Sequence, residues 1–249
     1  MNFSIFGTPK PFDGVTAIHQ LNAIKSWTLH SDDVLLFDAP KHIADRMGTR
    51  RIAGVRCNEA GLPYIDDMFW LAQILAEYDL MVYANADVIF GRGIEEALGR
   101  AADRFDRFLL VGQRYDVDLD EPLDFNALWQ ATLGRIITRR GVLHSVSGKD
   151  WFGFRRPLPI HLPPFVVGRP MWDNHVLQAH LRAGIPVIDA TRVVVVAHPN
   201  HEIARGRLGG KSFDHNVALG NVPSNQGRIS EATWVMTSDE IVKKEHESL

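Results

Sequence analysis

Over the first 115 residues, short runs of apolar residues alternate with longer stretches in which apolar residues return every three or four positions. A short apolar run bounded by turn residues predicts a strand, and the three-to-four spacing predicts an amphipathic helix. We therefore expect strands at 2–6, 34–37, 52–55, 80–84 and 108–111, and helices from about residue 14, over 65–78 and near 94–101. This alternation predicts an α/β fold in which helices cover both faces of a mostly parallel sheet.

The second half of the chain is less regular. Here the pattern predicts helices at 126–139 and 173–183, strands at 151–154, 186–188 and 193–197, and a proline-rich loop at 157–164. The segment 201–227 is rich in Gly, Asn and Ser and shows little periodicity, which is typical of a long loop or lid. From Ser238 onward the chain is charged, and we expect a peripheral helix there.

Composition narrows the class of protein. The chain has 249 residues, of which 45% are hydrophobic and 23% charged, which fits one globular domain. Its net charge of -3 argues against a binder of duplex nucleic acid. Cys57 is the only cysteine, which excludes an internal disulfide and a cysteine-based zinc site. With no transmembrane-length apolar run and no secretion-signal pattern, we expect a cytoplasmic protein.

Polar residues follow directly after the buried strand 80–84. Ligands of parallel sheets bind outside the carboxyl ends of the strands, and Asn85 and Asp87 stand at such an end. A carboxylate there suits Mg²⁺ or Mn²⁺ that bridges to a diphosphate. On spacing alone, a cap of the following turn is the simpler interpretation of Asp87.

A second carboxylate opens the helix predicted at 173–183. Asp173 follows Gly168 and Arg169, and its place at a helix N-terminus favours the ionised form. An ionised carboxylate that faces a cleft is a candidate general base. Aspartate is also a favoured helix N-cap, so a purely structural role is the alternative.

Two histidines come at the end of the strand 193–197. His198 ends the apolar run and His201 lies three residues further on. A histidine at a strand end can donate a nitrogen ligand to Mn²⁺, although a lone histidine is more often a core residue. Both histidines together with Asp87 would also suit zinc, an alternative that no HExxH-like arrangement supports.

In their order along the chain, these features resemble the GT-A glycosyltransferases. A strand that ends in Asn-Ala-Asp resembles their DxD motif, and 148–201 resembles their second half. In that half an FRR-type strand leads through a glycine to an acidic residue at a helix start, followed by two strands and a histidine. The resemblance covers about 3–200 and implies a GT-A-like mixed, mostly parallel sheet flanked by helices. It also implies a nucleotide-binding half (1–115), an acceptor and catalytic half (116–200), and a lid-like loop with a C-terminal tail (201–249).

The resemblance further implies roles for individual residues. Asp87 and His198 would bind the metal ion, and Asp173 would be the catalytic base, with Asp150 as the alternative carboxylate. The nucleotide sugar would contact Thr8, Pro9, Asp38, Pro63, Asn85 and Asp87. The acceptor side would be lined by Trp151, Arg169, Trp172 and Asn174, although large aromatic residues such as the two tryptophans also suit a core.

The function that the resemblance implies is a metal-dependent glycosyltransferase that uses Mn²⁺ or Mg²⁺. It would move a sugar from a nucleotide-diphosphate donor to a glycan or other hydroxyl acceptor, with inversion if Asp173 is the base. Asn85 replaces the first acidic residue of DxD and brings no charge, so a non-catalytic nucleotide- or carbohydrate-binding member is an alternative. A sugar-1-phosphate nucleotidyltransferase is less favoured, because the loop GTPKPFDG has Lys10 but no glycine run. The absence of GxGxxG after the first strand argues against an NAD-linked enzyme.

Overall fold

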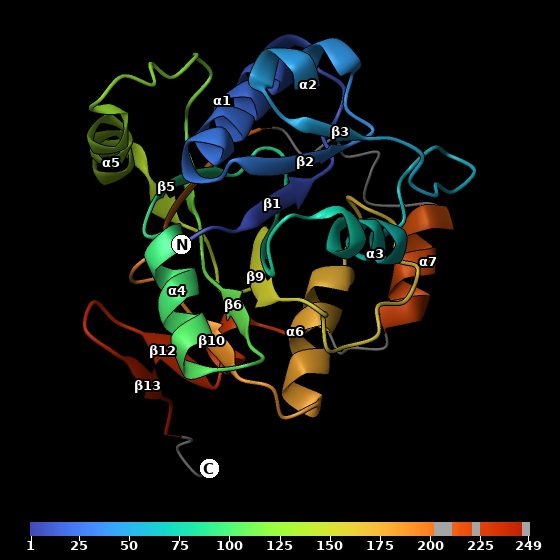
Figure 1. Ribbon diagram of the computed structural model, residues 1–249, viewed down its shortest axis with the longest axis vertical. Coiled ribbons are helices and arrows are strands. Elements are labelled where there is room, and N and C mark those ends of the chain that lie inside the picture. The colour runs from blue at the N-terminus through green and yellow to red at the C-terminus, as the bar shows by residue number, and fades with distance from the viewer. Residues whose placement is uncertain (202–210, 221–224, 246–249) are drawn as a thin grey trace.

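A nine-stranded sheet forms the centre of the molecule in the computed structural model, which describes residues 1–201, 211–220 and 225–245 (Figure 1). Its strands are β1 (Ser4–Gly7), β2 (Asp33–Phe37), β3 (Arg50–Ile52), β4 (Leu80–Ala84), β6 (Leu109–Val111), β9 (Trp151–Arg155), β10 (Val187–Asp189), β12 (Trp234–Met236) and β13 (Ile241–Lys243). Their order is β13-β12-β10-β6-β9-β4-β1-β2-β3. The pairs among β4, β1, β2 and β3 are parallel, whereas β9 is antiparallel to both β4 and β6. The sheet is therefore mixed and mostly parallel, which confirms the predicted α/β class.

Helices cover both faces of this sheet. On one face lie α1 (Gly14–His30) and α4 (Ile94–Arg104), and on the other lie α3 (Ile65–Leu75) and α6 (Trp172–Arg182). The short helix α2 (Lys41–Met47) links β2 to β3. Burying a fully apolar strand on both faces removes its side chains from water, which stabilises the fold by about 25 cal/mol per Å² of apolar area. The all-buried strands β1, β2 and β4 therefore anchor the core.

A second sheet of four short strands lies beside the first. It contains β5 (Ile89–Arg92), β11 (Val195–Pro199), β7 (Tyr115–Val117) and β8 (Val142–Leu143), in the order β5-β11-β7-β8. The helix α5 (Trp129–Arg140) packs on it through the buried side chains of Leu133 and Ile137. Because β5 pairs with β11, the turn after β4 is held next to the end of β11. The sequence patterns predicted β11 but none of the other three strands.

Glycine at position 7 allows β1 and β4 to end side by side. A Cβ atom on Gly7 would lie 2.3 Å from the carbonyl oxygen of Ala84, so any other residue would push the two strands apart. The parallel strands β2, β1 and β4 therefore end at one edge, where Asp38, Thr8 and Asn85 follow them. Polar residues that follow three neighbouring strands therefore share one edge of the sheet.

Three segments differ from the prediction. The segment 201–227 was expected to be a loop, but it contains α7 (Lys211–Gly220), while 202–210 and 221–224 lie outside the described residues. The buried residues of α7 are Asn216 and Gly220 rather than an apolar stripe, so periodicity gave no sign of a helix. The helix expected from Ser238 onward is wrong. Ile241–Lys243 form the strand β13 instead, which pairs antiparallel with β12. The third strand is at 50–52 rather than 52–55.

In the parts of the chain that the structure describes, no helix is both long and apolar enough to cross a membrane.

The buried His180 makes a prediction about stability. Burial within α6 lowers the pKa of His180 to about 4, although its ring contacts the Val176 carbonyl oxygen at 2.7 Å. An unfolded histidine titrates near pH 6.5, so the unfolded chain binds a proton that the folded chain does not, and stability falls as the pH drops from about 6.5 to about 4. When the pH falls from 6.5 to 4.5, the free energy of unfolding should decrease less in His180→Leu than in the wild type. We expect the difference to be on the order of 2 kcal/mol.

Urea denaturation at these two pH values measures this difference. His42→Leu, at an exposed position of α2, controls for the loss of a histidine. Identical pH dependence in His180→Leu and the wild type would contradict the prediction.

Candidate functional site

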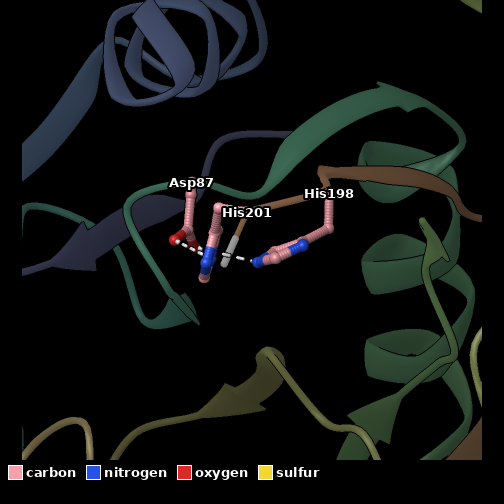
Figure 2. Close-up of side chains that lie close together, drawn as sticks. All are labelled: Asp87, His198 and His201. Atoms are coloured by element: carbon pink, nitrogen blue, oxygen red, sulfur yellow. Dashed lines mark ion pairs between the residues drawn. The ribbon is translucent and has the colours of Figure 1, made fainter. Parts of the chain in front are cut away.

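Three side chains from two distant segments converge at the edge of the sheet (Figure 2). Asp87 lies in the turn between β4 and β5, His198 belongs to β11, and His201 follows that strand. The Nε2 atom of His198 lies 3.5 Å from Oδ1 of Asp87, and the Nε2 atom of His201 lies 3.5 Å from Oδ2. One ligand atom from each residue falls within 4.8 Å of the others. We call these three residues the metal trio.

Two members of the metal trio, Asp87 and His198, have pKa values shifted toward the forms that bind a metal ion. Burial by itself raises the pKa of Asp87, but hydrogen bonds from His198 and His201 and the positive charge of Lys10 bring the pKa well below its usual range. Burial lowers the pKa of His198, despite the opposing effect of Asp87. A carboxylate and neutral imidazoles are the forms that coordinate a divalent ion. The donor set of one carboxylate and two imidazoles therefore fits Mn²⁺ or Zn²⁺.

Lys10 is a residue of this site that the sequence prediction missed. Its Nζ atom lies 2.7 Å from Oδ2 of Asp87. The backbone of Lys10 is held by the buried side chain of Gln20 in α1, which accepts from the Lys10 amide at 2.6 Å and donates to the Lys10 carbonyl at 3.1 Å. The only sign of Lys10 in the sequence was its position in the loop after the first strand, among prolines and glycines.

Asn85 does not join the metal trio. Its Oδ1 accepts a hydrogen bond from the Tyr83 hydroxyl at 2.8 Å, and its Nδ2 donates to Oδ1 of Asp150 at 2.8 Å. An aspartate at position 85 could not donate to a second carboxylate in this way. The side-chain amide of Asn85 therefore links Tyr83, in β4, to Asp150, the residue before β9.

A polar network connects the metal trio to Asp150. Arg114 donates to Oδ1 of Asp116 at 2.9 Å and also binds Oδ2 of Asp150. Oδ2 of Asp116 contacts Nδ1 of His144 at 2.6 Å, and its Oδ1 lies 4.0 Å from Nδ1 of His198. Burial raises the pKa of Asp116, but Arg114 and His144 reverse this effect and lower it overall. Arg114, Asp116 and His144 were not expected from the sequence, because they lie on or beside β7 and β8, which the sequence patterns did not predict.

Asp173 lies in the first turn of α6, one residue after the helix begins. Its Oδ2 is 3.4 Å from the Nζ atom of Lys149, whose side chain is fully buried. Lys149 also donates to the side chain of Asn174 and to the carbonyl of Ser147, both at 2.8 Å. Burial lowers the pKa of Lys149, and Asp173 partly offsets this shift. The carboxylate of Asp173, which is 22% exposed, is therefore fixed in place by a buried ammonium.

The tryptophans expected on the acceptor side pack inside the protein. Trp151 is completely buried and meets Phe90 edge to face, with ring centroids 5.8 Å apart. Trp172 is 5% exposed and packs edge to face on Tyr83 at 5.0 Å. Arg169 is half-buried and donates to the Gly168 carbonyl at 3.0 Å. The rings of Trp151 and Trp172, which were expected to line the acceptor side, therefore belong to the core, as large aromatic side chains usually do.

Three of the residues expected to bind the nucleotide, Thr8, Pro9 and Asp38, lie on the loops that follow β1 and β2, whereas Pro63 lies just before α3. The Thr8 hydroxyl donates to the Phe37 carbonyl at 3.1 Å, and Pro9 follows on the same loop. Asp38 has a φ of 51°, which is rare outside glycine, and accepts a hydrogen bond from the amide of Gly54 at 3.1 Å. The carbonyl of Pro63 accepts from the amide of Val167 at 2.9 Å. Nucleotide binding by these residues stays a prediction.

Solved structures of glycosyltransferases share this fold. Staphylococcus aureus TarS, solved as residues 1–349 with UDP-GlcNAc, aligns with 88% of this chain at 13% identity and a TM-score of 0.56, and this chain spans 65% of that one. Glucosyl-3-phosphoglycerate synthase from Mycobacterium tuberculosis aligns with 87% of this chain over 78% of its own, at 16% identity and a TM-score of 0.51. No family model matches the chain, and no curated protein matches it in sequence. The chain therefore has a GT-A-like fold, as the resemblance predicted.

The metal trio predicts a specific dependence on Asp87. Asp87→Asn removes the only carboxylate of the trio. Loss of a residue that merely supports a metal ligand lowers metal affinity by about 10- to 100-fold, so we expect loss of this carboxylate to lower Mn²⁺ affinity by at least about 100-fold. Isothermal titration with Mn²⁺ measures the loss. Asp45→Asn, which removes an exposed carboxylate on α2, is the control, and equal affinities in the two variants would rule out Asp87 as a ligand.

Proposed function

We propose that the protein is a metal-dependent glycosyltransferase that moves a sugar from a nucleotide-diphosphate donor to a hydroxyl acceptor. The observation that carries this proposal is the convergence of Asp87, His198 and His201 at the carboxyl edge of a GT-A sheet. Ligands of parallel sheets bind at this edge, and a hard oxygen ligand beside imidazoles suits Mn²⁺.

In this proposal the donor lies between the metal trio and the ends of β1 and β2. Asp87, His198 and His201 hold the ion, which when bound supplies positive charge that stabilises the departing diphosphate. The loops that carry Thr8, Pro9 and Asp38 receive the nucleotide. Oδ1 of Asp116, which accepts a hydrogen bond from Arg114, lies 4.0 Å from Nδ1 of His198, the ring nitrogen that does not face Asp87.

Asp173 is the favoured base for the acceptor hydroxyl. Both carboxylate oxygens of Asp150 are already engaged, Oδ1 with Asn85 and Oδ2 with Arg114. Asp173 contacts Lys149 through Oδ2 and is more exposed than Asp150, at 22% against 12%. The acceptor oxygen bonds to the anomeric carbon as the bond from that carbon to the diphosphate oxygen breaks, and the hydroxyl proton goes to Asp173. Attack from the face opposite the diphosphate inverts the anomeric centre.

The ligand set favours one second candidate, a zinc hydrolase. Two histidines and one carboxylate are also the protein ligands of catalytic zinc sites, which keep a fourth position for water. Elemental analysis of the purified protein separates the two candidates, because a zinc enzyme retains one equivalent of zinc through purification. Stoichiometric zinc that supports ester or amide hydrolysis, without any response to nucleotides, would favour the hydrolase.

The proposal predicts nucleotide binding that depends on metal. We expect one of UDP, GDP, CDP, ADP or dTDP to raise the melting temperature in the presence of Mn²⁺ and much less in its absence. A ligand at about 100 times its Kd stabilises the folded state by about 2.7 kcal/mol, which a melting scan detects easily. Folded protein that responds to none of the five nucleotides would contradict the proposal. A response without any transfer would indicate a non-catalytic binding protein.

The choice of base predicts different outcomes for two carboxylates. Asp173→Asn should keep the nucleotide-dependent melting shift but lose transfer by about 10²- to 10⁴-fold, the usual contribution of a general base. Asp150→Asn should instead lower the melting temperature of the free protein, because Arg114 loses an ionic partner. Transfer is measured with the donor that the melting screen identifies and a panel of sugar acceptors. Full transfer by Asp173→Asn would remove Asp173 from the role of base.

A further inference from the structure

We propose that Lys10 is an exchangeable counter-ion of the metal site. Its ammonium neutralises Asp87 until a divalent ion binds, and it then turns to the diphosphate of the donor. The exchange at Asp87 depends only on metal binding, while the diphosphate step rests on the proposed function.

The contact between Lys10 and Asp87 is the first observation. The Asp87 side chain is only 7% exposed, and a buried carboxylate needs a positive partner to stay ionised. Lys10 is the cation nearest to it within residues 1–201, 211–220 and 225–245, at 2.7 Å, while both histidines of the trio lie 3.5 Å away. Lys10 therefore supplies the charge that a metal ion would otherwise supply.

Lys10 contacts the Asp87 oxygen that faces His201. Oδ2 of Asp87 faces both Nζ of Lys10 and Nε2 of His201. An ion coordinated by this oxygen and His201 would lie close to the ammonium, and two positive charges at such a distance repel strongly in a partly buried site. Metal binding through Oδ2 therefore requires the ammonium to leave.

The structure lets the ammonium move while its anchor stays fixed. Gln20, which is 1% exposed, holds the backbone of Lys10 through two hydrogen bonds and also donates to the carbonyl of Pro11. The Lys10 side chain is 38% exposed, and its four-carbon stem rotates freely where it is not packed. The anchor lies directly after β1, on the loop where the proposed function places the donor. A displaced ammonium thus stays beside the expected diphosphate.

This exchange couples the two ligands. Metal binding alone must break the pair between Lys10 and Asp87, whereas metal binding together with a diphosphate gives the ammonium a new anionic partner. Each ligand should therefore strengthen the binding of the other by the same factor. A lysine with a purely structural role would not produce this coupling.

Calorimetry on the full chain tests the exchange. Mn²⁺ is titrated alone, and pyrophosphate is then titrated as its manganese complex, so that the result does not depend on the base of the donor. Lys10→Met should bind Mn²⁺ at least about 5-fold more tightly than the wild type and bind manganese pyrophosphate at least about 5-fold more weakly, the lower end of usual coupling factors. Lys10→Gln, which keeps a hydrogen-bonding group without charge, should shift both affinities in the same directions. Lys41→Met is the matched control, because it removes a lysine that also lies 2.7 Å from an aspartate, Asp45, but on an exposed helix.

The outcomes separate this inference from the proposed function. Opposite shifts of the two affinities in both Lys10 variants, with none in Lys41→Met, support the exchange. If the wild type binds Mn²⁺ and the Lys10 variants bind it no more tightly, the exchange is overturned and the metal site stands. If Mn²⁺ binding tightens but pyrophosphate binding is unchanged, the diphosphate step is overturned. If neither the wild type nor the variants bind Mn²⁺, both the exchange and the metal-dependent function fail.

Discussion

The buried carboxylate of Asp87 is the constraint on which the rest of the site depends. A carboxylate taken out of water must be matched by positive charge and hydrogen bonds, or it takes up a proton. In this fold the matching groups come from two other segments, Lys10 after β1 and the pair His198 and His201 at the end of β11. The antiparallel pairing of β5 with β11 brings the turn that carries Asp87 next to the two histidines, so the small sheet supports the metal trio.

A series of polar side chains extends from this carboxylate into the protein. Asp116 lies between His198 and Arg114, and Arg114 lies between Asp116 and Asp150. Asn85 closes the series by donating to Asp150. Each buried or half-buried charge therefore has an opposite or hydrogen-bonding neighbour, and such fully paired networks hold side chains in one arrangement. The uncharged Asn85 belongs to this network, which gives it a structural reason to differ from the acidic residue of DxD.

The sequence predicted the parts of this site that follow long buried strands. Asp87 and His198 were found because β4 and β11 are apolar and end in polar residues, and Asp173 was found because an amphipathic helix follows it. Arg114, Asp116 and His144 lie on or beside strands of two or three residues, which are too short to show an alternating pattern. Lys10 was missed for a different reason, because only the folded chain brings it to Asp87, 77 positions away. Residue type also says little about exposure, as the complete burial of Trp151 shows.

Two consecutive residues, Lys149 and Asp150, connect Asp173 to the polar network beside the metal trio. Asp150 faces Asn85 and Arg114, whereas Lys149 faces Asp173 and Asn174. Neighbouring side chains of an extended segment point in opposite directions, so the chain entering β9 reaches both groups at once. The backbone N–H of Asn85 also donates to the backbone carbonyl of Asp150 at 2.9 Å, which fixes this segment against the end of β4. This segment therefore contacts the end of β4 on one side and the first turn of α6 on the other.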